Sequence, residues 1–132
     1  MVVKPEAFLV QRFSWEDFNK AVDVIIDALR RKGLLSKVTQ IYGIPRGGLV
    51  LAVALSHKLN LPMTLALADI VARGGALIVD DISDSGKTMA IWGPLGVCSA
   101  TIHRVPSTIY IPDVWAVDRA EGVWVEYPWE VH

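Results

Sequence analysis

Three aspartates and a short glycine-containing turn lie close together near the middle of the chain. Asp80 and Asp81 directly follow the apolar run 76–79, and Asp84 comes just before Ser-Gly-Lys-Thr at 85–88. Carboxylates at the end of a buried strand can face ribose hydroxyls and a metal ion. The N–H groups of a tight turn that opens a helix can hold a phosphate. The segment 76–88 therefore carries the groups needed to bind a phosphorylated sugar.

The adjacent pair Asp80 and Asp81 has two interpretations. Successive side chains of a strand point to opposite faces of the sheet, so one carboxylate can bind a ligand while the other organises the loop. An isolated pair of this kind is more often two solvated turn residues. The buried strand before the pair and the phosphate-type turn after it favour binding. Asp84 can also cap the following helix, and this role is compatible with one in the site.

Gly86, Lys87 and Thr88 also match the end of a Walker A motif. That motif requires a second glycine five positions before its last glycine. Position 81 is an aspartate, so the sequence excludes a P-loop nucleotide site here.

A second glycine-containing turn, Pro-Arg-Gly-Gly, occupies 45–48. Taken alone, it is an ordinary turn between a strand and a helix, with Arg46 at the surface. Together with the 76–88 segment, this turn favours a second phosphate-binding loop. Two loops that both suit phosphate fit a substrate with phosphate at both ends.

The apolar pattern predicts strands that alternate with helices. A helix should start after Ser14, with Asp17 in the capping-box position, and end near Gly33. The run 49–59 is a second helix, and a short helix opens near Ser85. Strands are expected at 8–10, 38–44, 63–70, 76–79, 97–104 and 114–118, before an extended aromatic segment at 123–130. This is typical of an α/β domain with a mostly parallel sheet flanked by helices, whose ligands bind beyond the carboxyl ends of the strands.

Composition limits the function classes. The 132 residues suit a single domain, 1–132, and the net charge of -1 gives no basic footprint for nucleic acid. A content of 52% hydrophobic residues with five tryptophans points to an oligomer interface. The single cysteine, Cys98, excludes an internal disulfide and reads as a core residue. The sequence shows no signal peptide and no apolar run long enough for a membrane span, so a cytoplasmic protein is expected.

The segment 76–88 resembles the 5-phosphoribosyl-1-pyrophosphate (PRPP) motif of the type I phosphoribosyltransferases. The turn in 44–50 resembles the pyrophosphate loop of that family. The run 124–130 is similar to the base-recognition segment of bacterial xanthine-guanine phosphoribosyltransferases, within a C-terminal segment of about 105–132. The resemblance covers residues 8 to 130.

This resemblance implies roles for particular residues. Arg46 and Gly47 would contact pyrophosphate, with the Ile44–Pro45 bond as the candidate cis peptide. Asp80 and Asp81 would fix the ribose and hold Mg²⁺, directly or indirectly. The 5′-phosphate would bind at Asp84, Ser85, Gly86, Lys87 and Thr88, and Asp84 would also handle the proton at N7 of the base. The base would meet Trp124, Val125 and Glu130, although these residues could instead be core or dimer contacts.

Two departures from the family pattern stand out. The family's base-reading lysine precedes a proline, and that position here is Val105; Arg104 could replace it only in a shifted register. The long hood loop of the family is reduced to 64–75, where 65–68 is strand-like. Arg73 is the remaining basic residue of this segment, and it is the candidate there for a contact with pyrophosphate.

The resemblance implies an enzyme of purine salvage that uses PRPP and Mg²⁺. It would transfer phosphoribosyl to a 6-oxopurine (guanine, xanthine or hypoxanthine), releasing pyrophosphate, and would act as a homodimer or homotetramer. The missing hood and Val105 keep a second hypothesis open, a PRPP- or nucleotide-binding regulator that turns over weakly or not at all. An RNA-binding regulator of this fold has no support from the charge.

Overall fold

A five-stranded parallel sheet forms the centre of the computed structural model, which describes residues 8–130. The strand order is β3-β2-β4-β5-β6, and every neighbouring pair is parallel. The strands are β2 (Gln40–Gly43), β3 (Met63–Thr64), β4 (Ala76–Ser83), β5 (Cys98–Arg104) and β6 (Val114–Asp118). This confirms the predicted α/β architecture.

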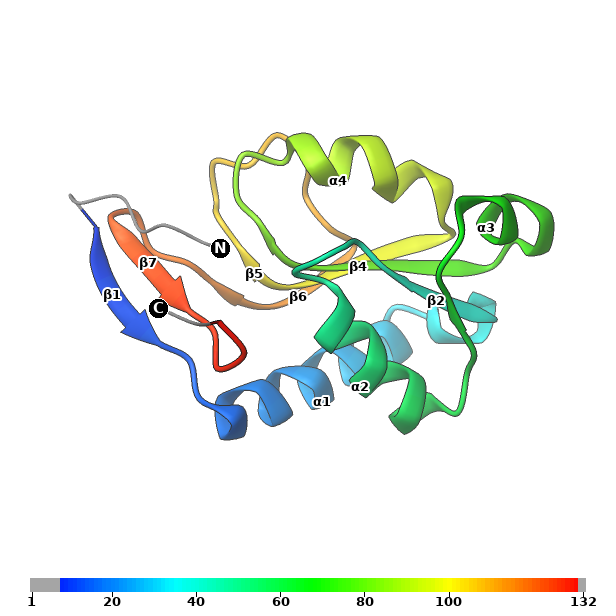
Figure 1. Cartoon of the computed structure of the whole chain (residues 1–132), viewed down its shortest axis with the longest axis horizontal. Helices are drawn as coiled ribbons and strands as arrows, with labels where there is room; N and C mark the ends of the chain where they lie inside the picture. Colours follow the sequence, from blue (N-terminus) through cyan, green and yellow to red (C-terminus); the bar gives the residue numbers. More distant parts are fainter. Residues whose placement is uncertain (1–7, 131–132) are drawn as a thin grey trace.

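Helices cover both faces of this sheet (Figure 1). The helices α1 (Trp15–Arg31) and α2 (Leu49–Leu59) pack on one face, and α3 (Leu67–Arg73) and α4 (Lys87–Trp92) lie on the other. Short 3-10 turns follow α1 and α4, at Leu35–Lys37 and Gly93–Leu95. A separate parallel ribbon of β1 (Leu9–Arg12) and β7 (Val123–Glu126) lies beyond the carboxyl ends of the strands.

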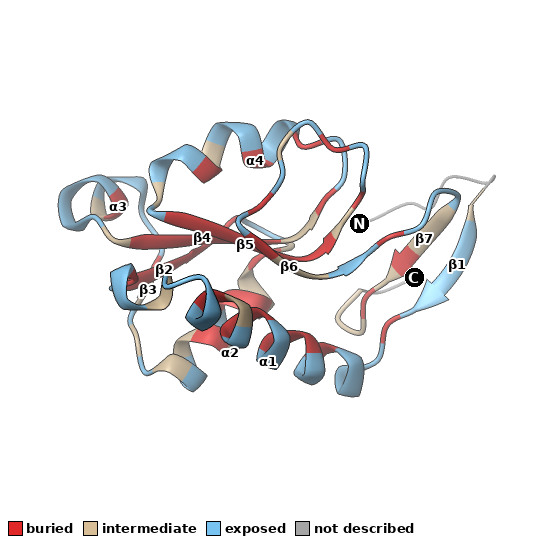
Figure 2. Ribbon diagram, turned by 180° about the vertical axis from the view of Figure 1, so that it is seen from behind, coloured by how far each residue is buried: buried red, intermediate tan, exposed pale blue. Residues whose placement is uncertain are grey.

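The core explains why β4 is central. Residues 76–79 are fully buried, because β4 has a strand on each side and helices on both faces. Figure 2 shows the buried residues concentrated in the sheet and on the inner faces of α1 and α2. Cys98 lies in this core, where burial raises the pKa of its thiol to about 11. No helix within residues 8–130 has the length and apolar character needed to cross a membrane.

Helix α1 begins as predicted. The Ser14 hydroxyl accepts from the N–H of Asp17 at 3.0 Å, and the Asp17 carboxylate accepts from the N–H of Ser14 at 2.9 Å. The helix buries one apolar face, which consists of Phe18, Ala21, Val22, Ile25, Ile26 and Leu29. The sequence pattern therefore determines both the start of α1 and the face it buries.

The prediction of a strand over 63–70 is wrong beyond Thr64. The chain forms α3 instead, with Ile70 buried. The Gln40 carboxamide donates to the carbonyls of Asp69 and Gly74, and the Thr64 hydroxyl bonds to Gln40. Because α3 ends just before β4 begins, Arg73 lies at the amino end of the strands. The expected contact of Arg73 with pyrophosphate is therefore wrong.

Candidate active site

The two glycine turns meet at the carboxyl ends of β2 and β4. The N–H of Ile44 donates to the carbonyl of Val79 at 2.9 Å. A Cβ built on Gly47 would lie 2.5 Å from a carboxylate oxygen of Asp81. The absence of a side chain at Gly47 thus lets the 45–48 turn approach the acidic pair directly.

The cis peptide of the 45–48 turn is Pro45–Arg46, not Ile44–Pro45 as expected. A proline ring restricts the bond that precedes it, which is why the sequence drew attention to that bond. Arg46 is exposed at this turn, next to the position where Gly47 meets Asp81.

Asp80 and Asp81 form a closely interacting carboxylate pair. Desolvation and the neighbouring Asp81 raise the pKa of Asp80 to about 9, and desolvation also raises the pKa of Asp81. Each carboxylate accepts a hydrogen bond from the backbone N–H of the residue that follows it. Asp80 accepts from Asp81 at 2.9 Å, and Asp81 accepts from Ile82 at 2.8 Å. Both border one pocket, so the expectation that they serve opposite faces is wrong.

These two carboxylates suit a metal ion that is coordinated mainly by the phosphates of a bound substrate. Asp80 is buried and Asp81 is half-buried, and neither has an ion-pair partner among residues 8–130, which favours a bound cation. Over the same residues, no group of three or more His, Cys, Asp or Glu side chains is placed to hold a metal. Mg²⁺ commonly binds through one or two carboxylates and the phosphates of a substrate. The pair therefore suits a magnesium–phosphate complex better than a free ion.

The turn after β4 forms a pocket of about 210 Å³. Gly86 has φ +89°, and a Cβ there would lie 2.5 Å from the Thr108 hydroxyl. The Ser83 hydroxyl bonds to that hydroxyl at 2.9 Å and donates to the Tyr110 carbonyl at 2.8 Å, which ties the turn to the 105–113 loop. The pocket is lined by Asp80, Asp81, Ile82, Ser83, Asp84, Ser85, Gly86, Thr88 and Met89.

Two predictions about this turn change in the structure. Lys87 is exposed and is not among the residues that line the pocket. The N-cap of α4 is Gly86, so the alternative role of Asp84 as the helix cap is wrong. The carboxylate of Asp84 instead pairs with Arg119, the residue that follows β6.

A second pocket of about 210 Å³ adjoins the first. It is lined by Asp81, Ile82, Asp84, Arg119, Trp124, Val125, Tyr127 and Glu130. The structure thus brings Trp124, Val125 and Glu130 together with Asp84. The last two residues of the expected segment 105–132 lie outside the described residues.

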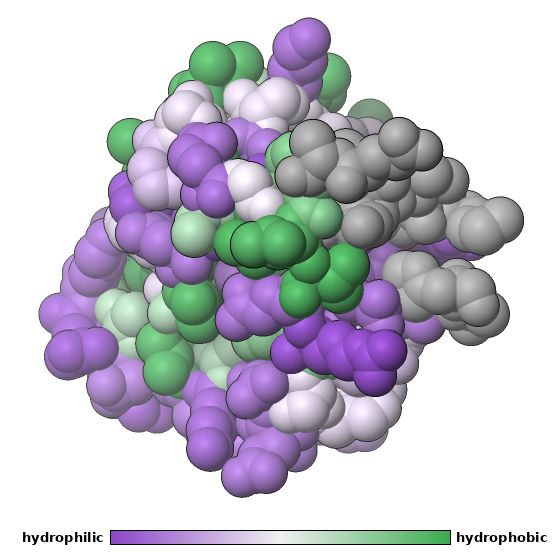
Figure 3. All heavy atoms as spheres, turned by 90° about the vertical axis from the view of Figure 1, so that its left-hand side faces the viewer, coloured by the Kyte–Doolittle hydropathy of each residue, from purple (hydrophilic) through white to green (hydrophobic). Residues whose placement is uncertain are grey.

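The aromatic segment shapes this second pocket. The Trp124 ring lies edge-on to Phe8, with centroids 6.1 Å apart, so the β1–β7 ribbon supports it. The Glu130 carboxylate accepts from the N–H of Tyr127 at 2.8 Å, which closes the turn after β7. In the orientation of Figure 3, hydrophilic residues make up much of the molecular face at this end, with smaller apolar groups among them.

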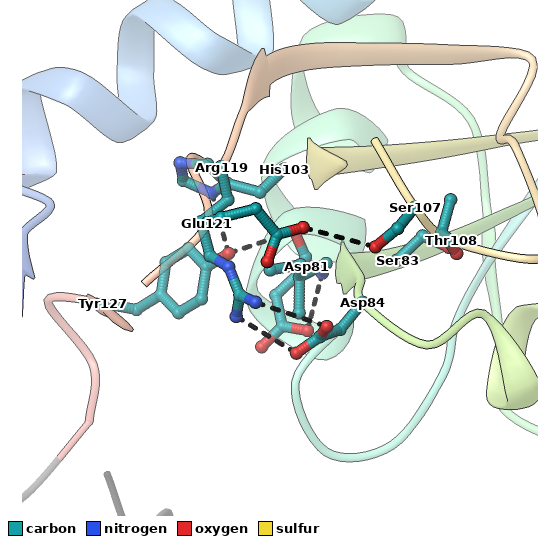
Figure 4. Close-up of polar contacts among 10 residues, drawn as sticks. Asp81, Ser83, Asp84, His103, Ser107, Thr108, Arg119, Glu121 and Tyr127 are labelled. Carbon is teal, nitrogen blue, oxygen red and sulfur yellow. Dashed lines mark hydrogen bonds and ion pairs between the residues drawn. The ribbon is translucent and has the colours of Figure 1, made fainter. Parts of the chain in front are cut away.

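Sequence reasoning missed Arg119 and Tyr127. Arg119 donates to both carboxylate oxygens of Asp84, at 3.0 and 3.3 Å. The Tyr127 hydroxyl donates to the carbonyl of Asp81 at 3.2 Å and lies 2.8 Å from Nδ1 of His103 (Figure 4). A basic residue directly after the predicted strand 114–118 was the available signal for Arg119.

His103 is a buried residue of β5. Burial and the charge of Arg119 lower its pKa to about 4, and burial raises the pKa of Tyr127. Both side chains are therefore neutral near pH 7. The pair links the end of β5 to the backbone of Asp81 through the Tyr127 hydroxyl.

Arg104 does not replace the lysine that is absent at Val105. Its guanidinium donates to both carboxylate oxygens of Asp118 at 2.9 Å and lies over the Trp115 ring at 4.1 Å. Val105 is 2% exposed, and neither residue lines a pocket of the site. The shifted register considered for Arg104 is therefore wrong.

Comparisons with known proteins show what the chain is similar to. No protein-family model matches the chain. A xanthine-guanine phosphoribosyltransferase of Idiomarina loihiensis is 27% identical over 90% of this chain and 86% of its own length. One from Cereibacter sphaeroides is 29% identical over 69% of this chain and 68% of its own length.

Solved structures extend the comparison. A purine phosphoribosyltransferase from Pyrococcus horikoshii has a TM-score of 0.74 and 26% identity, covering 93% of this chain and 95% of its own. A xanthine-guanine-hypoxanthine phosphoribosyltransferase from Helicobacter pylori has a TM-score of 0.73 and 22% identity over the same shares of the two chains.

The chain therefore has the type I phosphoribosyltransferase fold. Within that class it is related in sequence to the bacterial xanthine-guanine phosphoribosyltransferases. The resemblance seen in the motifs is confirmed.

Proposed function

We propose that the protein is a purine phosphoribosyltransferase that uses PRPP and a 6-oxopurine base. One observation carries this proposal. Two pockets of about 210 Å³ adjoin at the carboxyl end of β4 and share Asp81, Ile82 and Asp84. One contains a phosphate-type turn and the other an indole ring, which is the arrangement that a nucleotide requires. The sequence relatives support the same chemistry.

The residues of the chain divide the reaction between them. The N–H groups at 85–88 bind the 5′-phosphate, and Asp80 and Asp81 orient the ribose hydroxyls. As the bond from C1′ to the pyrophosphate oxygen breaks, Arg46 neutralises charge on the leaving group. N9 of the base forms the new bond to C1′, and Asp84 accepts the proton at N7.

Two carboxylates of the chain suit a Mg²⁺ ion that is bound to the substrate. Asp80 and Asp81 would hold it, because they are the adjacent carboxylates that line the sugar end of the site. When bound there, the ion would supply charge neutralisation at the leaving pyrophosphate. Deprotonation of this pair is expected when the cation binds, since a nearby positive charge lowers the pKa of a carboxyl group.

Assembly and location remain predictions of this proposal. A homodimer or homotetramer is supported by large apolar side chains that are exposed in the single chain, including Leu65, Val71 and Ile109, each at least 71% exposed. Purine salvage in the cytoplasm is the expected setting.

The test is product formation followed by chromatography. Protein, PRPP and Mg²⁺ are incubated separately with guanine, xanthine, hypoxanthine and adenine, and nucleotide and pyrophosphate are quantified together. We expect equal amounts of both products with a 6-oxopurine, and loss of both in Asp84→Asn. Asp23→Asn changes an exposed carboxylate on α1, far from the site, and should keep wild-type turnover.

Two other outcomes separate the hypotheses. Binding of PRPP without product from any base would overturn the enzyme proposal and support the regulator. Neither binding nor turnover would overturn both.

A further inference from the structure

One basic side chain, Arg119, is present among the described residues that line the base pocket. Its backbone N–H donates to the carbonyl of Arg104 at 2.8 Å, which fixes it at the carboxyl edge of the sheet. Its side chain is only 5% exposed. A buried guanidinium needs polar partners for its N–H groups, so the hydrogen-bond partner of each N–H group has to be identified.

Asp84 satisfies only part of that requirement. A guanidinium has five N–H donors. One from each terminal nitrogen goes to an Asp84 oxygen. The Nε–H is buried and has no partner within the described chain. The guanidinium also lies over the Phe8 ring, 5.4 Å from its centroid. Asp84 leaves the second N–H of each terminal nitrogen, and Arg119 lines an open pocket, so these donors remain for a ligand.

The adjacent groups make a donor–acceptor pair. Arg119 offers N–H donors, and the Asp84 carboxylate beside it accepts hydrogen bonds. A 6-oxopurine protonated at N7 presents the complementary pair on one edge, an oxygen at C6 beside an N–H. A base with an amino group at C6 would place a donor against the guanidinium.

We propose that Arg119 donates to the 6-oxo oxygen of the base and selects 6-oxopurines. This assignment rests on the function proposed above and adds the residue that determines base specificity. It gives a partner to the terminal N–H donors that the ion pair with Asp84 leaves over. Arg104 cannot serve, because Asp118 and Trp115 hold it outside the pocket.

The test compares hypoxanthine with unsubstituted purine, which lacks the oxygen at C6. The ratio of kcat/KM for the two bases is measured in wild type, Arg119→Met and Arg119→Lys. Arg104→Met is the matched control. It removes another arginine that makes two hydrogen bonds to an aspartate, Asp118, at the end of the neighbouring strand β5. A charged hydrogen bond to the oxygen predicts a wild-type ratio of about 100.

We expect this ratio to fall below about 10 in Arg119→Met, to take an intermediate value in Arg119→Lys, and to stay at the wild-type value in Arg104→Met. A loss of activity in Arg119→Met with an unchanged ratio would mean that Arg119 is structural, and would overturn the proposal. Collapse of the ratio in Arg104→Met would also overturn it. If Arg119→Met does not fold, the Arg119→Lys ratio decides.

Binding separates this proposal from the proposed function. Inosine 5′-monophosphate and purine riboside 5′-monophosphate are titrated by calorimetry into wild type and Arg119→Lys. Tighter binding of the 6-oxo nucleotide in wild type, reduced in the variant, supports the role of Arg119 even if no base is turned over. Equal binding of the two nucleotides in wild type overturns it, even if the enzyme is active.

Discussion

The Asp81 carboxylate lies directly against the backbone of Gly47, so closely that a methyl group on Gly47 would stand 2.5 Å from a carboxylate oxygen. Asp81 cannot easily yield, because the same side chain accepts from the N–H of Ile82 at 2.8 Å. This contact joins the proposed pyrophosphate turn to the proposed ribose-binding acids.

Gly47→Ala should therefore disturb both turns. We expect a loss of about 1–3 kcal/mol in the free energy of unfolding, the usual range for overpacking. A double-mutant cycle with Asp81→Ala, followed by chemical denaturation, measures the coupling. The alanine at position 47 should cost much less in the Asp81→Ala background. Equal costs in the two backgrounds would show that this contact does not constrain the turn.

The raised pKa of Asp80 predicts a dependence of stability on pH. With a pKa of about 9 in the folded protein and the ordinary value of 3.8 in the unfolded chain, Asp80 would bind a proton in the folded state that the unfolded state releases between these two pH values. Stability should therefore fall as the pH rises from about 4 to 9. Asp80→Asn removes this loss and should raise Tm at pH 8 by at least about 3 °C, with little change at pH 4.

Thermal unfolding across this pH range checks the prediction. Asp27→Asn is the control, since it neutralises an exposed carboxylate on α1 and should give a curve parallel to that of wild type. A parallel curve for Asp80→Asn as well would contradict the raised pKa.

The Tyr127 hydroxyl links β5 to the end of β4. Tyr127→Phe removes the bond to His103 Nδ1 and the bond to the Asp81 carbonyl. Nε2 of His103 already has no partner within residues 8–130, so both ring nitrogens would become unpaired and buried. We expect a loss of about 1–3 kcal/mol.

Urea denaturation of Tyr127→Phe measures this loss. Tyr42→Phe is the matched control, because Tyr42 is a buried tyrosine that packs flat on Trp92. We expect the control to change stability by less than half as much. Equal effects would mean that burial of the ring, and not the hydroxyl, accounts for the result.

Trp124 should report binding of the base. Stacking of a purine on the indole is worth about 0.5–1.5 kcal/mol, so Trp124→Ala should raise the KM for the base by about 3- to 10-fold. Intrinsic fluorescence gives a second measurement. Trp124→Phe should lose most of the quenching caused by guanosine 5′-monophosphate, whereas Trp15→Phe, at the exposed start of α1, should keep it. Full quenching in Trp124→Phe would exclude the stacking role.

The sequence pattern predicted the elements that local periodicity controls. The bounds of α2 agree with the predicted helix 49–59, and the capping box at Ser14 forms as expected. The acids and the glycine turns lie where strand ends of a parallel sheet must place them. Their proximity follows from the topology alone.

The wrong or missing predictions concern residues whose structure depends on contacts with residues far away in the sequence. The apolar run after Met63 fits a strand or a helix, and Gln40 on another strand supports the helix by holding its carbonyls. Arg119 is positioned by its ion pair with Asp84, which lies 35 residues earlier in the chain. No local pattern contains that pairing.

The central claim is that two adjoining pockets hold the two ends of one nucleotide. The most direct measurement is a crystal structure of the protein with guanosine 5′-monophosphate and Mg²⁺. The account predicts the phosphate on the N–H groups of 85–88, with the purine ring against Trp124 and its C6 oxygen on Arg119. A nucleotide whose phosphate occupies the turn while its base lies outside the Trp124 pocket would contradict it.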